Sequence, residues 1–168
     1  MVFPGTVYFE GTRVSEGRGT TRPFELVGAP YLDARVYAEA LAALELPGVI
    51  FRPTGFLPTF QKHAGRVCGG VFVHVTDREI FAPVLTGIGM VKTVFDLYPG
   101  EFLWKDPPYE YVFDRNPFDV IAGTAKIREM FEEKQDWDVI EAFCRSGVED
   151  FRRLRENYLL YGEGERLK

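Results

Sequence analysis

The stretch Arg66-Val-Cys-Gly-Gly-Val-Phe-Val-His-Val-Thr76 carries the clearest structural signal in the chain. Its valines alternate with Phe72, His74 and Thr76, and this spacing of two is typical of a strand with one face in the core. Two shorter strand patterns lie at Thr6–Glu10 and at Val49–Arg52. We expect the second to end before Pro53, because proline has no N–H to donate to a sheet.

Helical spacing of apolar residues marks the segments between and after these strands. The segments are Asp33 to the stop at Pro47-Gly48, Asp77 to about Tyr98, two short ones over 117–122 and 124–133, and a last one from Asp136 to about Tyr161. Asp33 and Asp77 are expected to begin their helices, with Pro83 tolerated in the first turn of the second. A bend is expected in the last helix at Ser146-Gly147.

The order of these elements predicts an α+β fold, with α/β as the alternative. A small mixed β-sheet is expected to pack with several helices, including a long amphipathic helix at the C-terminal end. A chain of 168 residues that is 46% hydrophobic can bury a core of its own. We therefore expect residues 1–168 to form a single domain.

Composition and spacing exclude several classes of function. The formal charge of −5 disfavours a nucleic-acid partner, which needs a basic face. No apolar run reaches the length of a membrane span. Two cysteines without Cys or His at ligand spacing predict free thiols and no metal site, and no phosphate-binding glycine pattern is present. We therefore expect no cofactor.

The loop Ser15-Glu-Gly-Arg-Gly-Thr-Thr-Arg22 concentrates the residues that can carry chemistry. Arg18 and Arg22 can each offer a forked pair of donors to a carboxylate, and Thr20 and Thr21 can bind sugar hydroxyls. Glu16 is a candidate catalytic residue, as a general acid or base, or else a substrate anchor. The alternative is that Glu16 and the arginines only pair with one another and hold the loop in place.

Two further candidates lie outside this loop. Arg52, followed by the aromatic loop with Phe56 and Phe60, could contact a sugar, although aromatic residues near a proline commonly serve packing. His74 could touch a ligand from its strand, although a lone histidine on a strand is more often a partly buried structural residue.

A long string that includes the Ser15–Arg22 loop resembles a known family. The string Thr6-Val-Tyr-Phe-Glu-Gly-Thr-Arg-Val-Ser-Glu-Gly-Arg-Gly-Thr-Thr-Arg-Pro-Phe-Glu25 is similar to the family once listed as DUF1343 and now known for NamZ-type exo-β-N-acetylmuramidases. The similarity continues through Gly28-Ala-Pro-Tyr-Leu32, Phe51-Arg-Pro53, Cys68-Gly-Gly-Val71, His74-Val-Thr-Asp77, Pro117-Phe-Asp119, Ala122-Gly-Thr124 and the segment Leu154–Tyr161.

The resemblance implies the C-terminal domain of a two-domain glycoside hydrolase that removes terminal N-acetylmuramic acid from peptidoglycan fragments. A larger Rossmann-like N-terminal domain, absent from this chain, would carry the principal catalytic acid, and the chain alone would be inactive. The implied ligands are muropeptides or fragments of N-acetylmuramic acid linked to N-acetylglucosamine. Arg18 or Arg22 would then bind the lactyl carboxylate, with Thr20, Thr21, Arg52 and His74 as further substrate contacts.

Alternatives stay open at this point. The chain could be a non-catalytic module that binds cell-wall sugar or stabilises the other domain, and shared ancestry alone does not fix function. Self-association into a homodimer through a face that meets the missing domain is another alternative. The parent protein would be bacterial, and its compartment stays open, with export or a periplasmic location included.

Overall fold

The computed structural model describes residues 1–160. The chain forms two compact units, Met1–Gln135 and Asp136–Lys168. Within the described residues, no helix combines the length and apolar character needed to cross a membrane.

The sheet of the first unit has three strands, β1 (Leu26–Ala29), β2 (Val49–Phe56) and β3 (Cys68–Val75). Their order is β1-β3-β2, so the stretch with the clearest strand pattern is the central strand. Val71 and Val73 are buried, as the alternation predicts. The α+β fold class is confirmed. Both strand pairings are antiparallel, however, so the expectation of a mixed sheet is wrong in this respect.

Strand β2 continues through Pro53, so the expectation that it ends before this proline is wrong. Pro53 lies opposite Val71 of β3, and β2 is an edge strand. One side of an edge strand needs no partner, so the missing N–H of proline costs no ladder hydrogen bond there.

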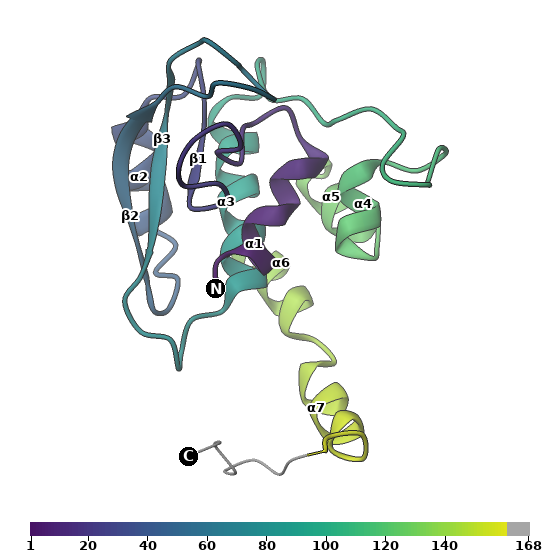
Figure 1. Ribbon diagram of the computed structural model, residues 1–168. Coiled ribbons are helices and arrows are strands. Elements are labelled where there is room, and N and C mark those ends of the chain that lie inside the picture. Colours follow the sequence, from purple (N-terminus) through teal and green to yellow (C-terminus); the bar gives the residue numbers. More distant parts are fainter. Residues whose placement is uncertain (161–168) are drawn as a thin grey trace. The chain divides into compact units, whose positions relative to one another are not determined.

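Helices α2 (Ala34–Ala42) and α3 (Pro83–Leu97) supply much of the core of this unit, and Figure 1 shows α2 beside the sheet. Asp33 caps α2 as predicted, accepting hydrogen bonds from the backbone N–H of Arg35 and Val36. Helix α3 begins at Pro83 and not at Asp77. The Asp77 carboxylate instead accepts a hydrogen bond from the N–H of Glu79 in a turn. Proline is common at the first position of a helix, which agrees with a start at Pro83.

The N-terminal segment is helical, so the predicted strand at Thr6–Glu10 is wrong. It forms α1 (Phe3–Thr6) and the 3-10 helix η1 (Val7–Gly11), which pack on α3. A Cβ atom on Gly5 would lie 1.9 Å from the carbonyl oxygen of Pro83, so α1 approaches α3 at backbone distance. This packing overrides the strand preference of the segment and leaves Phe9 fully buried.

Two short helices, α4 (Pro117–Ala122) and α5 (Lys126–Glu132), lie where the sequence predicts them. They close an aromatic cluster of Phe95, Phe102, Trp104, Phe118 and Phe131. Backbone hydrogen bonds join the segment that follows η1 to the segment around Trp104. Arg13 N–H donates to Leu103 and Lys105 N–H donates to Gly11, which holds the connector after Trp104 beside Glu10.

The second unit contains α6 (Trp137–Arg145) and α7 (Val148–Glu156). The predicted amphipathic segment is therefore helical, and it is interrupted at Ser146-Gly147, where a bend was expected. Gly147 has a φ of +76°, a conformation that ends a helix readily when the residue is glycine. The predicted end of this segment, at about Tyr161, lies outside the described residues.

Candidate functional site

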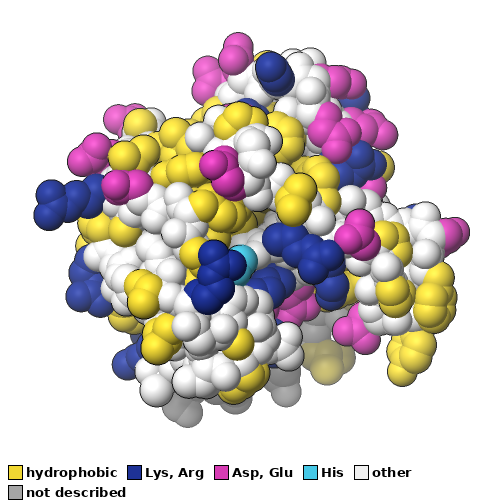
Figure 2. Space-filling view, turned by 90° about the horizontal axis from the view of Figure 1, so that it is seen from above, with side chains coloured by type: hydrophobic (Ala, Val, Ile, Leu, Met, Phe, Trp, Pro, Cys, Tyr) yellow, Lys and Arg dark blue, Asp and Glu magenta, His cyan; other side chains and the backbone are white. Residues whose placement is uncertain are grey.

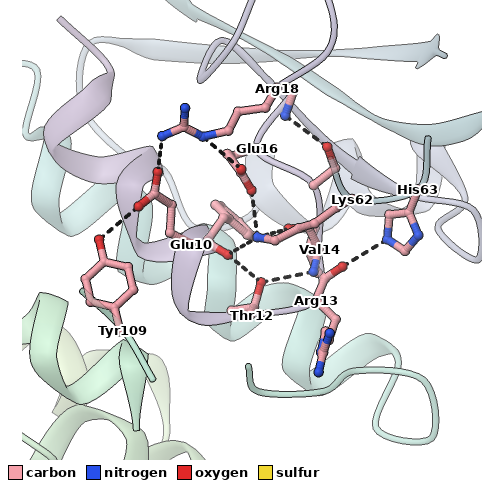
Figure 3. Close-up of polar contacts among 12 residues, drawn as sticks. Glu10, Thr12, Arg13, Val14, Glu16, Arg18, Lys62, His63 and Tyr109 are labelled. Atoms are coloured by element: carbon pink, nitrogen blue, oxygen red, sulfur yellow. Dashed lines mark hydrogen bonds and ion pairs between the residues drawn. The ribbon is translucent and has the colours of Figure 1, made fainter. Parts of the chain in front are cut away.

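Glu16 lies at the centre of a polar cluster (Figure 3). Its side chain is only 3% exposed, and both carboxylate oxygens have a cationic partner. One oxygen accepts a hydrogen bond of 2.7 Å from the Lys62 ammonium, and the other lies 3.3 Å from Arg18 Nε. A carboxylate paired on both oxygens is suited to fixing neighbouring cations in position.

Lys62 is anchored by three acceptors at once. Besides Glu16, its ammonium donates to the carbonyl oxygens of Phe9 at 2.8 Å and Val14 at 3.1 Å. These contacts use all three of its hydrogens. Burial lowers the pKa of Lys62, although the ion pair with Glu16 acts in the opposite direction. Lys62 therefore ties the 3-10 helix, the loop and the β2–β3 connection together.

Arg18 joins Glu16 to a second carboxylate, Glu10. Arg18 Nη2 donates to one oxygen of Glu10, and the Tyr109 hydroxyl donates to the other at 2.8 Å. Burial raises the pKa of Glu10, but the hydrogen bonds from Arg18 and Tyr109 outweigh it and the pKa is lowered. Burial and the hydrogen bond to Glu10 raise the pKa of Tyr109 to about 12. At neutral pH Glu10 is thus a carboxylate and Tyr109 a hydrogen-bond donor.

Close backbone packing fixes the loop that carries Glu16 and Arg18. The carbonyl of Glu16 accepts the N–H of Phe24 at 2.6 Å, and the carbonyl of Gly19 accepts that of Thr59 at 2.9 Å. Gly19 has a φ of +83°, and a Cβ atom there would lie 2.5 Å from the carbonyl oxygen of Phe60. Only glycine satisfies both conditions, so the loop is irregular, as predicted, but held in one conformation.

The cluster borders an open cavity of about 230 Å³. Its lining consists of Glu10, Glu16, Arg18, Gln61, Lys62, Lys105, Tyr109 and Glu110. Three cationic side chains balance three acidic ones, so a ligand would be recognised by the direction of donors and acceptors more than by net charge. Figure 2 shows one face of the molecule on which Lys and Arg side chains gather around a histidine, with acidic side chains beside them.

Arg18 is the best placed donor for a ligand in this cavity. Its inner edge, Nε and Nη2, faces Glu16 and Glu10, while no hydrogen-bond partner of Nη1 is found among residues 1–160. Nη1 and the second hydrogen of Nη2 form an outer fork, and the side chain is 42% exposed. Such a fork can bind a carboxylate through two parallel hydrogen bonds.

The other predicted site residues lie elsewhere. Arg22 and His74 line a second cavity of about 550 Å³, and the Arg52 guanidinium lies 5.2 Å from the centre of the Phe72 ring on the same strand pair. Thr20 and Thr21 line a third hollow of about 510 Å³. The structure therefore brings Glu16 and Arg18 together but separates them from the rest of the predicted set.

Local contacts explain what these residues do in the fold. The Thr20 hydroxyl donates to the carbonyl of Gly17 and accepts the N–H of Arg22. Arg22 is 60% exposed and lies 3.5 Å from Glu25. His74 packs on Phe72, and within the described part of the chain its buried Nε2 has no hydrogen-bond partner.

Sequence reasoning missed Glu10, Lys62 and Tyr109. Lys62 and Tyr109 are 46 and 99 residues away from the carboxylates that they bind, and no spacing rule connects them. The only signal for Glu10 is its place in the string that resembles the known family. In the part of the chain that the structure describes, no group of three or more His, Cys, Asp and Glu side chains is placed to hold a metal ion.

Comparison with known proteins agrees with the resemblance. A family model described as the C-terminal part of the exo-β-N-acetylmuramidase NamZ matches residues 1–161. The peptidoglycan β-N-acetylmuramidase NamZ of Bacillus subtilis (strain 168) is 42% identical over 161 residues, which are 96% of this chain and 37% of that protein.

Solved structures give the same result. A DUF1343 family protein from Bacteroides fragilis NCTC 9343 superposes with a TM-score of 0.80 at 30% identity, over 96% of this chain and 41% of its own. A second protein from that family and organism has a TM-score of 0.60 at 26% identity, and the match covers 95% of this chain and 40% of that protein. The chain thus spans about two fifths of the length of these relatives. It belongs to the family formed by the C-terminal part of NamZ exo-β-N-acetylmuramidases.

Proposed function

We propose that this chain is the C-terminal domain of a peptidoglycan-trimming exo-β-N-acetylmuramidase and contributes the Glu10, Glu16 and Arg18 cavity to an active site shared with an N-terminal domain. Family membership and the greater length of the relatives support the two-domain arrangement. The observation that carries the role of the cavity is the outer fork of Arg18, which two carboxylates hold in place.

The ligand of this fork is the lactyl carboxylate of terminal N-acetylmuramic acid. N-acetylglucosamine lacks this group, so an arginine that binds it selects one sugar over the other. Arg18 fits this role better than Arg22, the alternative that the sequence left open. Arg22 lies outside the cavity, and among residues 1–160 its guanidinium makes only a long ion pair, with Glu25.

Glu16 has an orienting role in this proposal. A general acid must hold a proton and reach the glycosidic oxygen, whereas Glu16 is buried and both of its oxygens face cations. Glu10 is kept ionised by Arg18 and Tyr109, so it is no better suited to protonate a leaving group. The proton donor then comes from the N-terminal domain.

A Glu16→Gln variant of the full-length protein tests the orienting role. The amide keeps the size of the side chain but weakens the attraction to Arg18 and Lys62, so we expect a higher KM for a disaccharide of N-acetylmuramic acid and N-acetylglucosamine. Unchanged turnover and unchanged KM would refute a role for Glu16 in the site.

The second candidate function is a non-catalytic module that binds cell-wall sugar or stabilises its partner domain. The balanced charges and fully paired Glu16 are the observations that favour it. Reassembly separates the two functions. The first predicts that a separately produced N-terminal domain is inactive and gains muramidase activity on mixing with this chain, whereas the second predicts full activity of the N-terminal domain alone.

A further inference from the structure

The third hollow, lined by Thr20 and Thr21, lies next in sequence to the charged cavity and shares two segments with it. Glu16, Arg18, Gln61 and Lys62 help to line the cavity, while the hollow of about 510 Å³ takes lining residues from the adjoining stretches 19–21 and 56–60. The two segments are joined between these places. Both the N–H and the hydroxyl of Thr59 donate to the carbonyl oxygen of Gly19, each at 2.9 Å. We call this third hollow the Phe60 groove.

The Phe60 groove differs from the cavity in its chemistry. Its lining is Gly19, Thr20, Thr21, Leu26, Phe56, Leu57, Thr59 and Phe60, with no charged residue among them. Phe60 is 59% exposed and Leu57 is 51% exposed, so both apolar side chains are open to a ligand. The exposed Thr21 hydroxyl has no hydrogen-bond partner in residues 1–160.

An exposed aromatic side chain, the available Thr21 hydroxyl and the absence of charge suit a neutral sugar ring. The C–H face of a pyranose can pack on the ring of Phe60, while its hydroxyl groups exchange hydrogen bonds with Thr21. They can also donate to Thr59, whose own hydroxyl hydrogen goes to Gly19. A charged ligand would be left without a counter-ion there. The close contact of Gly19 with the backbone of Phe60 keeps this platform in a fixed position relative to Arg18.

We infer that the Phe60 groove binds the N-acetylglucosamine unit that follows the terminal N-acetylmuramic acid, that is, the leaving group. This inference rests on the proposed function and extends it. The charged cavity then binds the N-acetylmuramic acid unit of the disaccharide, and the neutral groove binds its N-acetylglucosamine unit. The occupant is assigned by the shared segments, because consecutive residues border the two hollows at two places, Arg18 and Gly19 on one segment and Phe60 and Gln61 on the other.

The test is steady-state kinetics of the full-length protein with a Phe60→Ala variant. The substrate is the disaccharide of N-acetylmuramic acid and N-acetylglucosamine, and free N-acetylmuramic acid and free N-acetylglucosamine serve as inhibitors. We expect KM for the disaccharide and Ki for N-acetylglucosamine to rise about three- to tenfold, the range of one aromatic contact. Ki for N-acetylmuramic acid stays unchanged. Phe113→Ala is the matched control, because Phe113 is 72% exposed and lines neither hollow.

Each outcome has a separate meaning. An unchanged KM, or an equal rise in KM and in Ki for N-acetylmuramic acid, overturns the assignment of the groove while leaving the proposed function intact. No hydrolysis of the disaccharide by the wild-type protein overturns the proposed function, and the groove assignment with it. Circular dichroism of Phe60→Ala checks that loss of this exposed ring leaves the fold unchanged.

Discussion

At the residue scale, Lys62 shows how one cation organises the site. Its ammonium donates to two backbone carbonyls and to the buried Glu16 carboxylate. A Lys62→Met change keeps the stem but removes every one of these donors. It leaves Glu16 with Arg18 as its remaining partner, so we expect the free energy of unfolding to fall by about 2–4 kcal/mol.

Urea unfolding measures this loss, with Lys105→Met as the matched control. Lys105 lines the same cavity, but within the described chain its ammonium makes no hydrogen bond or ion pair, and it lies 5.6 Å from the centre of the Tyr109 ring. The Lys105→Met change should lower the free energy of unfolding by less than about 1 kcal/mol. An equal loss of unfolding free energy in the two variants would show that the hydrogen bonds of the Lys62 ammonium do not stabilise the fold.

Glu10 links stability to pH. Its folded-state pKa lies below the ordinary value of 4.5, because the hydrogen bonds from Arg18 and Tyr109 outweigh the effect of burial. The stabilisation from Glu10 is therefore present above about pH 4.5 and is lost as the pH falls through the folded pKa. Unfolding of Glu10→Gln should depend less on pH below this value than unfolding of the wild type.

The measurement is a series of urea unfolding curves from neutral pH down to about pH 3, where paired carboxylates lose their charge. Glu110→Gln, an exposed position on the rim of the same cavity, should leave the pH dependence unchanged. Identical pH dependence in Glu10→Gln and the wild type would mean that the Arg18 and Tyr109 contacts do not stabilise the charged form.

The sequence could predict part of the site at this scale. Glu16 and Arg18 stand two residues apart in a loop of unusual composition, so local reasoning finds them. Lys62 and Tyr109 come from distant segments whose approach depends on the whole fold. Thr21 and Arg22 belong to the same loop as Glu16 and Arg18 but line other hollows. The left-handed Gly17 and Gly19 change the direction of the chain before Thr21 is reached.

At the scale of elements, the loop carrying Glu16 and Arg18 depends on Gly19. Gly19 and Gly65 both have positive φ values, +83° and +74°, but of the two only Gly19 leaves no room for a Cβ atom, which would meet the backbone of Phe60. Gly65→Ala should lower the free energy of unfolding by about 1 kcal/mol, because alanine disfavours the left-handed conformation. Gly19→Ala adds a contact of 2.5 Å with Phe60 and should cost about 2–4 kcal/mol.

Thermal or urea unfolding of the two variants gives the comparison. The difference between them isolates the contact of the loop with the β2–β3 connection, since the conformational penalty is common to both. If Gly19→Ala were no more destabilising than Gly65→Ala, this loop would be free to move away from Phe60, and the fixed geometry of Arg18 would be in doubt.

Elements with a strong local pattern were predictable and others were not. The alternation in β3 and the Asp33 cap of α2 are local signals, and the structure confirms both. The strand expected at Thr6–Glu10 is wrong because contact with α3 decides its conformation. The end expected at Pro53 is wrong because only the sheet order makes β2 an edge strand.

At the scale of the whole molecule, the long similarity string was more informative than periodicity. Composition and spacing led to the α+β class and to a loop rich in donors, while the family followed from the string around Ser15–Arg22 and is confirmed over residues 1–161. Periodicity could not reveal that Glu16 is buried and paired, because burial depends on the packing of η1, the loop and Lys62 together.

The central claim is that Arg18 selects the muramic sugar, and kinetics of two conservative variants test it most directly. In the full-length protein, Arg18→Lys keeps a charge beside Glu10 and Glu16 but loses the outer fork. We predict that kcat/KM for the disaccharide of N-acetylmuramic acid and N-acetylglucosamine falls about ten- to a hundredfold, while Arg22→Lys stays within about twofold. Equal effects of the two changes, or a larger one for Arg22→Lys, would contradict the account.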